Sequence, residues 1–191
     1  MKFVLVATAF AALTLAAPAS LGKRAVFSTK TYDELSISGG VAGNGQQEAL
    51  DVLAGLPDDL STVEEADLDF LNSVNQIAND AETEAFNPAI EAATDEDEKD
   101  ALQVCPVHMQ DGVRWATRTL MNHGFQQRGK DKNKILKLTA TVLKLQAQAA
   151  QGKDVADKLA AEQKKLDKNI ALDEDAAGLP STALSFDATT S

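Results

Sequence analysis

Side chains that could do chemistry gather in one window of this 191-residue sequence. The window VCPVHMQDGVRWATRTLMNHGFQQ, from Val104 to Gln127, holds the only Cys, the only Trp and both His of the chain. Cysteine and histidine bind zinc or pair as nucleophile and base. The set Cys105, His108 and His123 supplies three ligands, whereas a structural zinc site normally uses four, and no third group orients a Cys–His pair. We therefore predict no catalytic residue, no metal site and no cofactor.

The first 19 residues have the features of a secretory signal peptide. One lysine precedes an apolar run over residues 3–17, and small residues end at Ala19. Lys23 and Arg24 form a dibasic pair of the kind that kexin-type proteases cut, although an exposed basic pair is the simpler alternative. We predict a secreted, extracellular protein with a short propeptide at 20–24 and a mature chain that begins at Ala25.

The charge and the cysteine count restrict the partners and the fold. The chain has 29 acidic and 18 basic residues, a net charge of −11, which repels nucleic acid phosphates and anionic lipids. No later segment is long and apolar enough to span a membrane. A single Cys cannot form an intramolecular disulfide, so helix packing must hold the fold. These features predict no nucleic acid and no membrane span, and leave an unknown protein or cell-wall partner and the oligomeric state open.

The spacing of apolar residues predicts an all-α protein, a small helical bundle. Residues 46–54 favour a short helix ending at Gly55. Ser61 with Glu64 and Thr62 with Glu65 are potential capping boxes for a following helix. That helix has one apolar face, formed by Phe70, Leu71, Val74, Ile77, Ala78, Ala81 and Ala85. Asn87-Pro88 then predicts the start of a new helical segment.

The strongest periodicity predicts a C-terminal antiparallel helical hairpin. The first helix carries the stripe Ile135, Leu138, Val142, Leu145 and Ala149, widened by Leu136 and Leu143. Gly152 stands where a C-cap glycine belongs, and Asp154 is expected to cap the second helix. The second helix carries Val155, Leu159, Leu166 and Ile170. The short turn favours this hairpin over a parallel coiled coil with another copy.

The ends of the helical domain, residues 25–177, have the composition of loose segments. Ala25 to Gly45 ends in GGVAGNG, which lacks the Lys-Ser/Thr and the preceding strand of a phosphate-binding loop, so a flexible linker is predicted. The Ser/Thr-rich tail at 178–191 is expected to be loose or O-glycosylated.

Two charged groups have simple structural explanations. The acidic run Asp95 to Glu98 lacks the spacing of a calcium loop and suits a solvated helix start. Five lysines fill the polar face of the first hairpin helix, and we expect them to complement acidic neighbours within the fold, with partner binding as the alternative. These are Lys130, Lys132, Lys134, Lys137 and Lys144.

Four segments in order resemble a family of small secreted proteins from filamentous fungi, often called effector-like. They are KTYDELSISGGVAGNG, ANDAETEAFNPAIEAA, KILKLTATVLKLQAQAAQG and AAEQKKLDKNIALDEDAAG. The resemblance covers nearly the whole mature chain. It implies a cysteine-poor, helical, secreted protein with no known catalytic residues.

The chain departs from that family pattern at the window Val104 to Gln127. In the pattern, a stretch like Ala101–Gln103 runs directly into one like Arg128–Lys130, whereas here 24 residues intervene. An intron of the corresponding 72 nucleotides would keep the reading frame if it were retained. The codons GTATGC or GTATGT encode Val104-Cys105 and match the preferred first nucleotides of a fungal intron. The codon CAG encodes Gln127 and matches the last nucleotides of an intron. We predict that Val104 to Gln127 is a retained intron, with a lineage-specific loop as the alternative. Pro106 and Gly112 should then interrupt an otherwise long helix.

Together these features predict a non-enzymatic interaction protein of unknown molecular activity. The alternative is a helical carrier whose hairpin opens to bind a lipid or another apolar small molecule.

Overall fold

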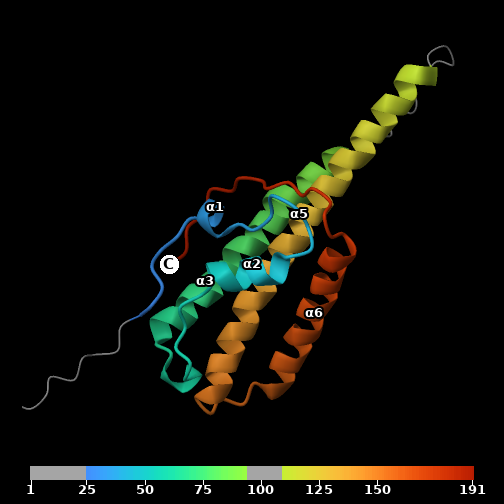
Figure 1. Ribbon diagram of the computed structural model, residues 1–191. Helices are drawn as coiled ribbons and strands as arrows, with labels where there is room; N and C mark the ends of the chain where they lie inside the picture. The colour runs from blue at the N-terminus through green and yellow to red at the C-terminus, as the bar shows by residue number, and fades with distance from the viewer. Residues whose placement is uncertain (1–24, 94–108) are drawn as a thin grey trace, which may run out of the picture.

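Figure 1 presents a computed structural model of the protein, in which residues 25–93 and 109–191 are described. These residues form helices and no strand, apart from the two isolated bridges Thr31–Thr189 and Val41–Pro180. The helices are α1 Tyr32–Leu35, α2 Gly45–Val52, α3 Glu65–Ala81, α5 Met109–Ala150 and α6 Ala156–Asp175, with a 3₁₀ turn η1 Leu60–Thr62 and a π-helical segment η2 Glu82–Phe86. The prediction of an all-α fold is confirmed.

Helix α5 is the central element of the bundle. It packs against α3 on one side and against α6 on the other, and α2 crosses in front of it in Figure 1. Helices α5 and α6 are joined by a short turn and run antiparallel, which confirms the predicted hairpin. The N-terminal turns of α5 extend well beyond the other labelled helices (Figure 1).

The predicted apolar faces form one core. Six of the seven positions on the face of α3 and η2 are buried, and Ala85 is half-buried. On α5, Ile135, Leu136, Leu138, Val142 and Leu145 are buried in the same core or its edge. Ala149 was predicted on this stripe and is exposed, while Ala147 is fully buried, because the last turn of α5 packs against the loop before α3.

The turn of the hairpin depends on a glycine, as predicted. Gly152 has a φ of +83°, a conformation that residues with a Cβ rarely adopt. Its N–H donates to Ala149 O, and the N–H of Lys153 donates to Gln148 O, which is the Schellman pattern. The predicted cap at Asp154 is wrong, because α6 begins one residue later with Val155 at the N-cap and no side-chain capping bond.

The predicted capping boxes before α3 are also wrong. Ser61 and Thr62 lie in the turn η1, where Ser61 Oγ donates to Asp59 Oδ1 and Thr62 Oγ1 donates to Asp59 O. Their hydroxyls are therefore engaged before α3 begins, and its N-cap Glu64 makes no side-chain capping bond. A complete capping box forms instead at α1, between Thr31 and Glu34.

The helix does not break before Pro88. The chain passes from α3 through the π-helical segment η2 into helical residues 87–93, so the new segment predicted at Asn87 continues the same helical path. Proline lacks an N–H and clashes with the carbonyl four residues earlier in a regular α-helix. A wider π turn immediately before Pro88 accommodates both effects.

Helix α5 also runs without a break through Gly112, contrary to the predicted interruption. A glycine inside a helix costs only about 1 kcal/mol relative to alanine, which a helix of 42 residues tolerates. Pro106 lies outside the described residues, as do the predicted signal peptide, the predicted propeptide and the acidic run at 95–98. No helix in the described parts of the chain is long and apolar enough to cross a membrane.

The two ends of the domain are packed rather than loose. In the predicted linker, Ile37, Ser38 and Ala42 are buried, and the N–H of Ala42 donates to Leu179 O. The tail is tied to the N-terminal segment, since the N–H of Thr190 donates to Lys30 O and Tyr32 meets the ring of Phe186 edge-on. Both segments are polar in composition but satisfy their backbone groups on each other.

Candidate functional site

The residues singled out in the sequence do not form a site in the described structure. Ala19, Lys23, Arg24, Cys105 and His108 lie outside the described residues. Trp115 and His123 lie on the N-terminal half of α5, where only the helical path is described. Among the described side chains, in residues 25–93 and 124–191, no group of three or more His, Cys, Asp or Glu is placed to hold a metal ion.

A groove runs over α5 between α3 and α6. It consists of two hollows of about 550 and 330 Å³ that share Asn75 and Glu162 in their linings. Three helical stripes supply its polar side chains, each with steps of three or four residues. These are Asn72, Asn75, Asn79 and Glu82 from α3 and η2, Lys134, Lys137, Thr141, Lys144 and Gln148 from α5, and Lys158, Glu162, Lys165 and Asn169 from α6, with Lys168 beside the last stripe.

The groove lies on the side of α5 turned away from α2. At 3.6 residues per turn, the groove residue Thr141 is about opposite Lys132 on the helix. Lys132 faces α2, where its Nζ lies 2.7 Å from Glu48 Oε2 and donates to the carbonyls of Gly39 and Val41. Lys132 is fully buried, and its hydrogen bonds hold the glycine-rich segment against α5. The opposite face of α5 lines the groove.

One wall of the groove is a ladder of hydrogen bonds between α3 and α5. Because the two helices are antiparallel, positions descend on α5 as they rise on α3. Lys144 Nζ donates to Asn72 Oδ1 at 2.8 Å, and Asn75 Nδ2 donates to Thr141 Oγ1 at 2.8 Å. The ladder fixes the register of the two helices and holds the lysine ammonium groups at the edge of the groove.

The ladder ends at Glu82, the first residue of the π-helical segment. Its carboxylate lies 2.6 Å from Lys137 Nζ, 3.6 Å from Lys134 Nζ and 3.9 Å from Lys130 Nζ. Burial alone would raise the pKa of Glu82, but the hydrogen bond from Lys137 and the charges of the three lysines outweigh it and lower the pKa. One carboxylate therefore serves three ammonium groups.

Asp131 lies beside this cluster and behaves in the opposite way. Its carboxylate lies 4.0 Å from Lys134 Nζ and accepts a hydrogen bond from Gln127 Nε2 at 3.0 Å. Burial raises the pKa of Asp131, and the charges of Lys134 and Lys130 offset this only in part. Asp131 is thus a second acidic neighbour of Lys134 whose ionised form is less favoured in the fold than that of Glu82.

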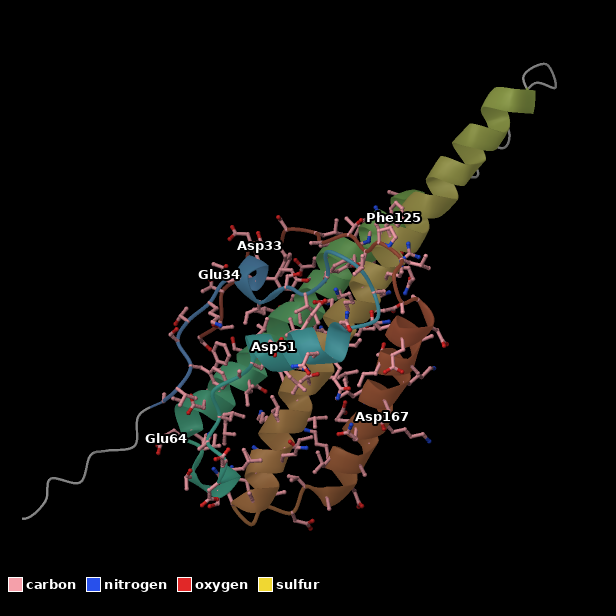
Figure 2. All side chains as sticks on the ribbon, viewed as in Figure 1. Asp33, Glu34, Asp51, Glu64, Phe125 and Asp167 are labelled. Carbon is pink, nitrogen blue, oxygen red and sulfur yellow. The ribbon has the colours of Figure 1, made fainter. Side chains whose placement is uncertain are left out.

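The other wall, on α6, carries the most accessible cations. Lys158, Lys165 and Lys168 are exposed. Lys165 pairs with Glu162 at 2.8 Å, whereas Lys158 and Lys168 have no ion pair with any described residue. Figure 2 labels Asp167 on the same helix, and this carboxylate accepts a hydrogen bond from Gln163 and does not line the groove.

The lining gives the groove a charge opposite to that of the whole chain. Six lysines and two glutamates line it, while the chain has a net charge of −11. The remaining lining residues are amides, one threonine and the leucines Leu71, Leu138, Leu145 and Leu172. Leu172 is 46% exposed and adds apolar surface at one end. Such a set can bind an anion by charge and by hydrogen bonds from amides.

The lysines were visible in the sequence, but the groove was not. The expectation that Lys130, Lys132, Lys134 and Lys137 complement acidic residues of the fold is confirmed by their pairs with Glu82 and Glu48. Lys144 instead pairs with an amide. The stripe Asn72, Asn75, Asn79 and Glu82 was missed, although its helical spacing is a signal that the sequence contains.

The fold and the groove define an all-α protein with a basic inter-helix groove on an acidic body. The chain belongs to the family described as a domain of unknown function, DUF8454, which matches residues 27–109 and 118–185. No curated protein and no solved structure matches the chain. The unmatched residues 110–117 fall inside the window Val104 to Gln127, and the rest of that window lies within the matched ranges.

Proposed function

We propose that this protein acts outside the cell as a non-enzymatic interaction protein, and that its groove binds an acidic segment of a partner protein. The observation that carries this proposal is the concentration of six lysines along one groove of a chain whose net charge is −11. Opposite charges on partner surfaces speed association and select the partner. The predicted signal peptide and the resemblance to small secreted fungal proteins support the extracellular, effector-like setting.

The residue types in the groove favour a peptide over other anions. Amide side chains both donate and accept hydrogen bonds, as a peptide backbone requires. The lining has no Arg, the side chain best shaped for bidentate binding of phosphate, and no aromatic ring that could stack on a sugar. Leucines below a lysine rim match a helix with leucines on one face and glutamates beside them.

The two lysines without an ion pair provide a direct test. We expect the double variant Lys158→Gln and Lys168→Gln to weaken binding of a fluorescent amphipathic Glu/Leu peptide by roughly tenfold in fluorescence polarisation. Binding to the unchanged protein should also weaken as salt rises. The matched control is Lys153→Gln with Lys164→Gln, which removes the same charge at exposed positions outside the groove.

The results separate the groove from general charge. Equal losses in the two double variants, or no loss in either, would overturn the assignment of the groove as the binding site. Tighter binding of polygalacturonate than of the peptide would overturn the choice of a protein partner. The carrier alternative requires the hairpin of α5 and α6 to open and expose core residues such as Leu138, Val142 and Leu166, and no specific observation favours it.

A further inference from the structure

The first described residues of the chain are held by one buried carboxylate. The N–H groups of Val26 and Phe27 both donate to Asp67 Oδ1, with N···O distances of 2.9 and 3.0 Å. Asp67 lies in the first turn of α3 and is only 2% exposed. The ring of Phe27 stacks on Phe70 with 4.5 Å between centroids, so the segment is fixed by packing as well. In Figure 1 this blue segment lies beside the N-terminal end of α3.

Asp67 has no cation partner in the described structure. No Lys or Arg with a described side chain, in residues 25–93 or 124–191, forms an ion pair with it. Its partners are neutral N–H groups, together with the favourable dipole at the start of α3. A buried carboxylate is normally paired with a positive charge, because removing an ion from water is costly. A positive group beside Asp67 would therefore stabilise its ionised form.

Cleavage after the dibasic pair Lys23-Arg24 can supply such a group, as a new α-amine on Ala25. Hydrolysis of the Arg24–Ala25 bond by a protease specific for dibasic sites consumes one water, whose hydroxyl goes to the carbonyl carbon of Arg24 and whose proton goes to the nitrogen of Ala25. At neutral pH the new carboxyl group loses a proton and the new amine gains one. The resulting α-ammonium lies one residue from the N–H of Val26, which is already bonded to Asp67.

We infer that cleavage after Arg24 creates an α-ammonium group at Ala25 that pairs with the buried carboxylate of Asp67, so that processing locks the N-terminal segment onto α3. This inference depends on the dibasic site and is independent of the groove. Proteolysis would thereby be coupled to stability, because only the cleaved chain carries a positive charge on the nitrogen of Ala25. A chain that is not cleaved after Arg24 keeps a neutral amide nitrogen at residue 25.

The test compares two chains that differ only at their start. One begins at Ala25; the other begins at Gly22 and carries Lys23→Gln and Arg24→Gln, which prevents cleavage and removes nearby charge. In urea titrations, the chain that begins at Ala25 should have an unfolding constant roughly tenfold lower. This difference should vanish in Asp67→Asn, which keeps an oxygen acceptor for both N–H groups. Asp69→Asn is the matched control, since Asp69 is exposed on the same helix.

A second measurement addresses the amine itself. In the chain that begins at Ala25, acylation of the α-amine by an amine-reactive reagent at neutral pH should be several-fold slower than in its Asp67→Asn variant. Equal reactivity in these two proteins would overturn the inference. So would an equal unfolding constant for the two starts, or a difference that persists in Asp67→Asn.

Discussion

At the scale of single residues, Glu82 is the side chain that neutralises part of the cluster of Lys130, Lys134 and Lys137. It is only 15% exposed. We predict that Glu82→Gln destabilises the protein by about 1–2 kcal/mol at pH 7, because the lysines lose their shared partner and repel one another. The change in unfolding free energy is measured by urea denaturation monitored by circular dichroism. Glu84→Gln is the control, since Glu84 is exposed in the same π-helical segment and makes no ion pair with a described residue.

The pH dependence of this effect has a definite sign. The pKa of Glu82 is lowered from 4.5, so its stabilising contribution is present above that pH and is lost as the pH falls through the folded-state pKa. The difference between the unchanged protein and Glu82→Gln should therefore shrink below pH 4.5. Asp131 has a raised pKa, so its ionised form is penalised in the fold and this penalty disappears on acidification. A difference that grew at low pH would contradict the role given to Glu82.

The residue types of the site were predictable, but their burial was not. The polar face of α5 can be drawn from the sequence, and the pairing of its lysines with acids follows from charge. Lys132 looks like its neighbours in that pattern, yet it is fully buried between α2 and the segment at Gly39 and Val41. Nothing local distinguishes it, because its partners are about 90 residues away in the chain.

At the scale of elements, two glycines of α5 have opposite roles. A Cβ at Gly129 would meet Thr182 O and lie 3.1 Å from Phe86 Cε1, whereas a Cβ at Gly124 would meet only the flexible guanidinium of Arg128. We predict that Gly129→Ala destabilises the protein by about 1–3 kcal/mol through this overlap. Gly124→Ala should be neutral or stabilise by about 0.5 kcal/mol, because alanine favours the helix. Thermal unfolding of both variants compares the same substitution in one helix.

Equal stability of these two variants would show that the tail does not rest on α5 at Thr182. Because Thr182 O approaches α5 so closely at Gly129, the helix needs a residue without a Cβ at this position. Figure 2 labels Phe125 at the place where α5 leaves the bundle, and the N–H of Thr182 donates to its carbonyl. The tail therefore uses one face of α5 as its support.

Long periodic elements were predictable, whereas their exact ends were not. The hairpin follows from the stripe on α5 and from Gly152, since both depend on local geometry. The capping boxes at Ser61 and Thr62 failed because Asp59 offers the same hydroxyls a competing turn. Pro88 marked an irregularity in the right place, but a π turn absorbs it without ending the helix.

At the scale of the whole molecule, the two ends of the domain hold each other. Their composition predicts loose segments, because Gly, Ser and Thr offer little apolar area. What orders them is contact between residues 160 positions apart, as between Lys30 and Thr190, and such contacts leave no local pattern in a sequence. The tail also reaches α3, where the N–H of Ser191 donates to Ser73 Oγ.

Removal of the tail should therefore weaken the whole fold rather than trim its surface. We predict that a chain ending at Pro180 loses about 3 kcal/mol of unfolding free energy in urea titrations, because Tyr32 loses the ring of Phe186 and the N-terminal segment loses its backbone partners. Phe186→Ala should account for part of this loss. Ser185→Ala should not change stability, since Ser185 is exposed on the same segment. An unchanged urea midpoint in the shortened chain would mean that the helices alone carry the stability, and that the ends are ordered by the bundle without supporting it.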